Sequence, residues 1–242
     1  MTSLRAFATS CIGCPANFSV VRDFFGYASG PPWKLAKTQA GLPQSLSILE
    51  QIKRLKQKHF HLDVIRVGTD SNGLLSPKDE QNLDCAVQMA REIYGAIGVG
   101  IGRVKRWWRI PLSDNTGFDV IDDDCEAADL IDEFDAPGDG IDVFLVLAWA
   151  GDTLGTTPTK GDGVAVESRE DDFYGTGRTF SHELGHYFGL DHENDTPNNL
   201  MCQTGKANPK AGSNLQLNSV QANSIKNIVP PSRGWDDMHP PC

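Results

Sequence analysis

The stretch HELGHYFGLDH, residues 182–192, decides how the rest of the chain is interpreted. Residues four apart lie on the same face of a helix, so His182 and His186 can present ring nitrogens to one metal ion, with Glu183 beside them. Gly189 lacks a Cβ and can adopt a left-handed conformation that ends the helix and brings His192 to the same ion. Three neutral imidazoles with one open position are the ligand pattern of a catalytic zinc ion. The stretch therefore predicts one catalytic Zn²⁺, with Glu183 as the general base.

A second motif, NNLM at residues 198–201, follows the third histidine and places Met201 nine residues after His192. The pattern HExxHxxGxxH followed by such a methionine resembles the metzincins, a group of zinc metalloproteases. The resemblance implies a methionine turn, in which Met201 forms an apolar floor beneath the zinc site. It also implies a zinc-dependent endopeptidase that acts on a protein or peptide substrate.

The subfamily indicated by the motifs is pappalysin-like or matrixin-like. GRT at 177–179 and GHY at 185–187 resemble the pappalysins, whereas GLDH at 189–192 and the short run to Met201 resemble the matrixins. The pair at 192–193 is similar to the astacins, but Gln203 stands where an astacin has a metal-associated tyrosine. A tyrosine ligand is therefore not expected.

Hydrophobic periodicity predicts a mixed α/β (α+β) fold. The metzincin resemblance implies that this fold is of the zincin class. We expect helices at 45–58, 76–95 and 218–228, and strands at 61–67, 101–110, 141–149 and 163–168, the last as an edge strand to which an extended substrate pairs. By the metzincin resemblance, residues 45–190 form an upper lobe with a twisted mixed sheet, two helices and the zinc helix. Residues 191–242 form a small irregular lower lobe with the methionine turn and a C-terminal helix. Residues 1–44 have no predicted role.

The composition restricts the partners. A chain of 242 residues with a net charge of −10 does not favour nucleic acid or an anionic membrane as the main partner. No apolar run is long enough to span a bilayer. Secretion or export is the favoured localisation, although the first residues form no clear signal peptide. The sequence leaves the oligomeric state open.

Cysteines and carboxylates suggest further sites. Six cysteines allow disulfides, including Cys202 with Cys242, and one idea is that Cys11 or Cys14 supplies a thiolate to the zinc and inhibits the enzyme. Eleven carboxylates between residues 119 and 142 could bind Ca²⁺, but a solvated acidic helix and loop is the favoured interpretation. His59 and His61 share one face of a strand, where a core or surface role is favoured over a second metal site.

Two alternatives to an endopeptidase stay open. One is a zinc-binding module that has the metzincin fold but no proteolytic activity, and the other is a zinc amidase acting on a non-protein substrate. Glu183 discriminates against the first alternative, because a protein that has lost catalysis has no need of the base.

Overall fold

The computed structural model describes most of the chain from residue 58 onward. The described residues are 58–69, 77–111, 117–118, 120–134, 136, 140–158, 163–168, 173–196, 198–203 and 215–229. The helix predicted at 45–58, the N-terminal cysteines and Cys242 lie outside these ranges or at their margin. None of the described helices combines the length and the apolar character needed to cross a lipid bilayer.

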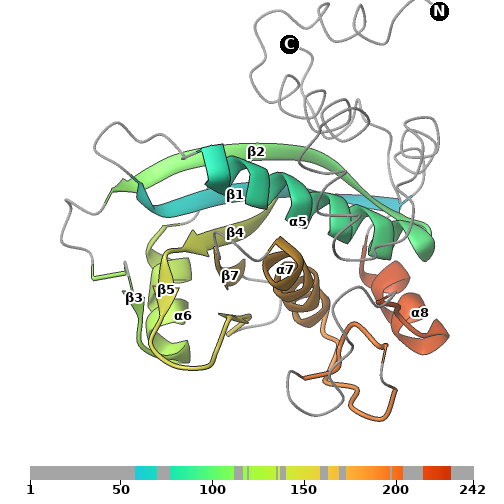
Figure 1. Cartoon of the computed structure of the whole chain (residues 1–242). Coiled ribbons are helices and arrows are strands. Elements are labelled where there is room, and N and C mark those ends of the chain that lie inside the picture. The colour runs from blue at the N-terminus through green and yellow to red at the C-terminus, as the bar shows by residue number, and fades with distance from the viewer. Residues whose placement is uncertain are drawn as a thin grey trace, which may run out of the picture.

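Strands and helices are interspersed along the described chain (Figure 1). The elements in order are β1 (Lys58–Thr69), α5 (Pro77–Ala96), β2 (Val99–Pro111), β3 (Val120–Ile121), α6 (Asp124–Glu133), β4 (Gly140–Val146), β5 (Ala148–Trp149), β6 (Gly155–Thr156), β7 (Gly163–Glu167), α7 (Phe173–Tyr187) and α8 (Ser219–Ile228). The fold is therefore a mixed α/β fold, as predicted. The run predicted as one strand at 141–149 is divided between β4 and β5.

The main sheet has the strand order β2-β1-β4-β7-β6 among the described residues. Its first four strands are parallel, and β6 pairs with β7 in the antiparallel direction. Parallel strands with both faces covered read as continuous apolar runs, and β4 and β7 have this character. Val164, Ala165 and Val166 in β7 are fully buried.

The prediction that 163–168 is an edge strand is wrong. β7 lies between β4 and β6, and β6 occupies the end of the sheet. The physical reason is that β6 contributes two residues, Gly155 and Thr156, which are too few to produce a recognisable period in the sequence.

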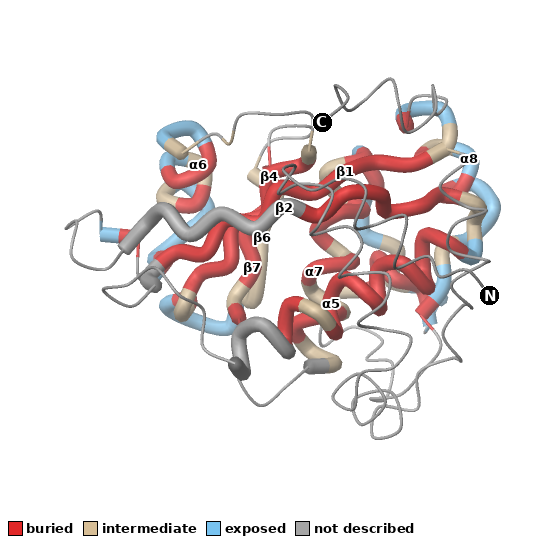
Figure 2. The backbone as a smooth tube through the Cα atoms, turned by 90° about the horizontal axis from the view of Figure 1, so that it is seen from above, coloured by how far each residue is buried: buried red, intermediate tan, exposed pale blue. Residues whose placement is uncertain are grey.

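Helices cover both faces of the sheet, with α5 and α7 on one side of the strands and α6 on the other (Figure 2). The larger core cluster joins apolar residues of β1, β4, α5 and α7, including Leu62, Val143 and Leu184. The smaller cluster joins the opposite face of the sheet to α6 through Ile65, Phe144 and other residues. In this arrangement α7 packs against α5 and β7. This packing fixes the position of His182, Glu183 and His186 on α7.

Helix α6 carries much of the acidic stretch. Asp123 caps the helix by accepting hydrogen bonds from the backbone N–H groups of Cys125 and Glu126, and acidic side chains at a helix N-terminus are stabilising. Leu130 and Ile131 pack into the smaller core, so the helix is amphipathic. The expectation of a solvated stretch is wrong for Asp142, which is buried and accepts a hydrogen bond from the N–H of Ala136.

The C-terminal helix α8 begins with a capping box. The Asn218 side chain accepts from the backbone N–H groups of Val220 and Gln221, and the Gln221 side chain accepts from the N–H of Asn218. Ile225 and Val229 belong to the same core as the main sheet. The segment after His192 therefore shares its hydrophobic core with the upper part of the fold, and the division into two lobes stays a prediction.

Candidate metal centre

Helix α7 carries two of the predicted metal ligands and ends where the motif requires a turn. Gly189 has φ of 75°. The N–H of Gly189 donates to the carbonyl of His186, and the N–H of Leu190 donates to the carbonyl of Gly185. This pair of bonds is a Schellman motif, which depends on a left-handed residue and is best satisfied by glycine. The chain then reverses and carries His192 back toward the helix.

The three predicted ligands lie together. The Nε2 atom of His186 is 3.1 Å from Nε2 of His182 and 3.1 Å from Nε2 of His192. One nitrogen from each ring lies within 4.8 Å of the others. Two ligands at 2.0–2.1 Å from one ion, at a tetrahedral angle, would be about 3.3 Å apart. The spacing of the rings therefore fits a tetrahedral metal site.

Hydrogen bonds at the other side of the rings determine which nitrogen is protonated. Nδ1 of His182 lies 2.8 Å from the carbonyl oxygen of Leu200, and Nδ1 of His186 lies 2.7 Å from the carbonyl oxygen of Leu190. A carbonyl oxygen can only accept, so both Nδ1 atoms carry the proton. In the neutral rings both Nε2 atoms then present lone pairs to each other.

Two facing lone pairs at 3.1 Å do not form a hydrogen bond, and a shared cation removes their repulsion. Burial lowers the pKa of His182 to about 3, which keeps this ring neutral and able to bind a metal. Burial also lowers the pKa of His192. The donor set, three neutral imidazoles with backbone carbonyls behind two of them, suits zinc.

Met201 packs against α7, the helix that carries His182 and His186. Its side chain is fully buried, and a Cβ added at Gly185 would lie 2.3 Å from Met201 Sδ. The absence of a side chain at Gly185 therefore allows the methionine to pack directly against α7. The N–H of Glu193 donates to the carbonyl of Met201, and Arg178 Nη2 donates to the carbonyl of Cys202 at 2.8 Å. The turn is therefore tied both to α7 and to the loop that follows this helix.

A buried amide pair joins this turn to α8. Asn199 Nδ2 donates to Gln221 Oε1 at 2.9 Å, and Gln221 Nε2 donates to Asn199 Oδ1 at 3.1 Å. Asn199 Oδ1 also accepts from the N–H of Met201. Leu200 lies between Asn199 and Met201, and its carbonyl oxygen contacts Nδ1 of His182. The amide pair therefore restrains the backbone segment that carries this carbonyl group.

Glu183 is 6% exposed and adjoins the histidines on α7. Burial raises the pKa of Glu183 to about 7; the hydrogen bond from Thr157 opposes this rise and the carboxylate of Asp124 adds to it. A cation bound by the histidines would lower this pKa again, because it favours the carboxylate. Perturbed carboxyl groups in a cleft are typical of functional sites.

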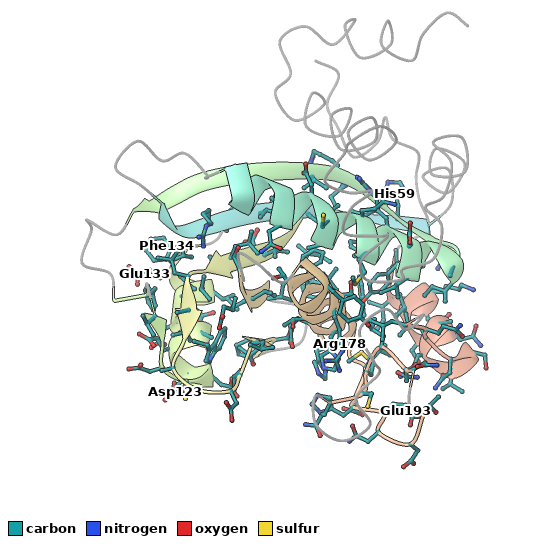
Figure 3. The ribbon with its side chains drawn as sticks, in the orientation of Figure 1. His59, Asp123, Glu133, Phe134, Arg178 and Glu193 are labelled. Carbon is teal, nitrogen blue, oxygen red and sulfur yellow. The ribbon has the colours of Figure 1, made fainter. Side chains whose placement is uncertain are left out.

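A cleft runs along the histidines. Its lining includes Asp124 from α6, residues 152–157 around β6, residues 189–192, 202 and 203, and five residues of α7, which are Arg178, Thr179, His182, Glu183 and His186. Gln203 is at the cleft, where its N–H donates to Asn194 Oδ1 and its Oε1 accepts from Asn194 Nδ2. Figure 3 shows Arg178 at α7 and Glu193 on the loop that follows the helix.

The other predicted residues lie elsewhere. His59 (Figure 3) and His61 are buried on β1. His61 Nδ1 accepts from the N–H of Arg103, which indicates a core role. The described residues provide no support for calcium, because the group of metal-binding residues found in them is the histidine cluster. Cys85 and Cys125 form no disulfide bond, and the pairing of Cys202 with Cys242 involves a residue outside the described ranges.

Sequence reasoning missed Thr157 and Gln221. Both are polar residues in polar segments, and their partners lie 26 and 22 residues away, so no local pattern identifies them. The carbonyl groups of Leu190 and Leu200 were also not predictable as partners, since every residue has one.

Comparison with protein-family models and with curated proteins finds no match. Similar solved structures do exist. The metalloproteinase-II of Bacteroides fragilis matches with a TM-score of 0.50 and 16% identity over 82% of this chain, and this chain spans 60% of its length. An archaemetzincin from Methanopyrus kandleri has a TM-score of 0.49 and 16% identity, covering 70% of this chain and 94% of its own.

A zinc-dependent peptidase from Methanocorpusculum labreanum has a TM-score of 0.43 and 13% identity, covering 68% of this chain and 99% of its own. At these identities the comparison concerns the fold alone. The Bacteroides protein supports a mixed α/β fold similar to that of a metalloproteinase.

Proposed function

We propose that this chain is a zinc-dependent endopeptidase of the metzincin type, with a pappalysin-like or matrixin-like subfamily as the finer prediction. The observation that carries the proposal is the convergence of three histidine Nε2 atoms beside a buried glutamate at a cleft. Two parts of this arrangement cost free energy in the absence of a ligand: the carboxyl group of Glu183 is buried, and the lone pairs of the histidine Nε2 atoms face one another. Such costs are typical of functional sites.

His182, His186 and His192 would hold the ion. When bound, zinc would act as a Lewis acid and lower the pKa of water to about 7. Glu183 would accept a proton from the attacking water and return it to the nitrogen of the departing amine. Its location next to His182, with no part in the ligand set, suits a base that must stay free to exchange protons.

An extended peptide would add to the sheet beside β6. This strand is at the end of the sheet, and Gly155 and Thr156 line the cleft. Strand addition orients a peptide through its backbone, so the strand can pass the ion with residues on both sides of the cleaved bond. This geometry favours an endopeptidase, and the substrate strand is expected at β6 rather than at β7.

The test uses the full chain loaded with one equivalent of zinc and a mixture of unstructured peptides analysed by mass spectrometry. We expect internal cleavage that a chelator abolishes and added zinc restores. Glu183→Gln should keep the zinc and lose at least ~100-fold in kcat/KM, which is the scale of a lost general base. Glu133→Gln, on the exposed end of α6, is the matched control and should cleave normally.

Retention of activity in Glu183→Gln would remove this residue from the mechanism. Absence of peptide cleavage by the zinc-loaded wild type would exclude the endopeptidase. In that case hydrolysis of small amides, measured in parallel, separates an amidase from a zinc-binding module that performs no catalysis.

A further inference from the structure

Thr157 follows directly after β6 and contacts the glutamate on α7. Its Oγ1 atom is 2.9 Å from Oε2 of Glu183 and 3.0 Å from the backbone carbonyl oxygen of the same residue. One hydroxyl group therefore lies within hydrogen-bonding distance of two acceptors. It has a single proton, so it donates to one of them at a time.

This arrangement provides a partner for Glu183 in both of its protonation states. When the carboxyl group is ionised, the Thr157 hydroxyl donates to Oε2. When the proton is on Oε1, the Thr157 hydroxyl can still donate to Oε2 or turn to the backbone carbonyl of Glu183. In neither state is the hydroxyl left without a partner in a partly buried place, which would cost free energy.

The position of Thr157 is fixed by close packing of β6 on α7. A Cβ added at Gly155 would lie 2.7 Å from Thr179 Cγ2, 2.9 Å from the carbonyl oxygen of Ala165 and 3.2 Å from Glu183 Cγ. The backbone of β6 thus lies against the Cγ methylene of Glu183, and Thr157 contacts the carboxyl group of Glu183 two residues later. Both contacts restrict the same side chain.

We propose that Thr157 is a positioning residue for Glu183: it occupies Oε2 and leaves Oε1 as the oxygen that exchanges the proton during hydrolysis. This inference rests on the proposed function. The inference goes beyond the proposed function because it assigns a role to a residue outside the HExxH motif and distinguishes the two carboxylate oxygens of Glu183. A base whose orientation is fixed in advance loses less freedom on reaching the transition state.

The experiment compares Thr157→Val, which is similar in shape and lacks the hydroxyl, with Thr157→Ser, which keeps it. Thr196→Val, at an exposed position, is the control for the loss of a threonine hydroxyl. We expect Thr157→Val to lower kcat ~10–100-fold, because a hydrogen bond to a charged group is lost, and to leave KM and zinc content within about two-fold. Thr157→Ser should restore kcat to within about three-fold of the wild type.

A double-mutant cycle separates a role through Glu183 from a general structural role. In the Glu183→Gln background, Thr157→Val should change the residual rate by less than about two-fold, because the base on which Thr157 acts is absent. An equal loss in both backgrounds would overturn the proposal. So would a loss confined to KM or to zinc content.

A measurement without substrate keeps the inference testable if the chain cleaves no peptide. Infrared bands of the zinc-loaded protein that disappear in Glu183→Gln belong to the Glu183 carboxyl group. These bands should shift in Thr157→Val and return in Thr157→Ser; unchanged bands would refute the contact. If Thr157→Val does not fold, Thr157→Ala, which removes the same hydroxyl without retaining a branched side chain, is compared in its place with the same expected outcomes.

Discussion

Adding one methyl group at Gly185 tests the packing beneath the metal centre. In Gly185→Ala, the new Cβ would lie 2.3 Å from Met201 Sδ and 3.1 Å from Met201 Cε. Ordinary contacts between such atoms are about 3.5–4.0 Å, so the sulfur must move by roughly 1.2–1.7 Å. Met201 is fully buried, and its neighbour Leu200 supplies the carbonyl that orients His182. The displacement therefore affects a segment that supports a metal ligand.

Two effects of opposite sign determine the change in stability. Overpacking a core costs about 1–3 kcal/mol, whereas replacing glycine by alanine within a helix stabilises by about 1 kcal/mol. Gly177→Ala is the matched control on the same helix, because its Cβ would meet Met89 Cε at 3.1 Å, a contact that a flexible thioether can relieve. The net expectation is a loss of about 0–2 kcal/mol for Gly185→Ala and a gain of about 1 kcal/mol for Gly177→Ala.

Thermal unfolding in a chelator, followed by a zinc titration, measures both consequences. The two variants differ by the overpacking cost of about 1–3 kcal/mol, so we expect Gly185→Ala to unfold about 2–12 °C below Gly177→Ala, at about 2–4 °C per kcal/mol for a chain of this size. Its zinc Kd should rise about ten-fold or more, because the group that orients His182 is displaced. If the two variants have equal stability and equal zinc affinity, the close contact between Gly185 and Met201 does not exist and the reasoning is refuted.

Three further predictions concern the metal and its support. His192→Ala should lower zinc occupancy at equal free zinc, measured by elemental analysis, and full occupancy would exclude this residue as a ligand. Gln221→Leu breaks the pair with Asn199 and should weaken zinc binding about ten-fold in a chelator competition, whereas Asn223→Ala, exposed on the same helix, should not. Removing zinc should lower the free energy of unfolding by about 4 kcal/mol when free zinc had been 1,000 times Kd, and an unchanged denaturation midpoint in the chelator would contradict this.

The elements that the sequence predicts well are those with a local signal. The strand at 61–67 and the helix beginning near Pro77 have a clear period and a start signal, and both are found, with longer bounds for β1. The C-terminal helix begins at Ser219, one residue after its predicted start. Its N-cap residue, Asn218, directly precedes it and binds backbone N–H groups of the first helical turn, which is a local signal. Such features depend on neighbours along the chain.

Features that depend on distant partners were not predictable. The order of strands places β6 at the end of the sheet, and nothing in two residues of sequence indicates that pairing. Gly185 falls within the recognised motif, but the sequence does not show why a glycine is required there. The reason is that Met201 packs against this position and leaves no room for a side chain. Thr157 and Gln221 act through single hydrogen bonds or pairs of bonds to residues far along the chain, and a polar side chain carries no sign of its partner.

X-ray absorption at the zinc edge tests the central claim most directly, on the full chain loaded with one equivalent of zinc. The account predicts three imidazole nitrogens at about 2.0–2.1 Å and one further oxygen or nitrogen, falling to two imidazoles in His192→Ala. Cys202 also lines the cleft, so sulfur is the competing ligand that the method would detect at about 2.3 Å. A sulfur ligand, or a spectrum that His192→Ala leaves unchanged, would contradict the account.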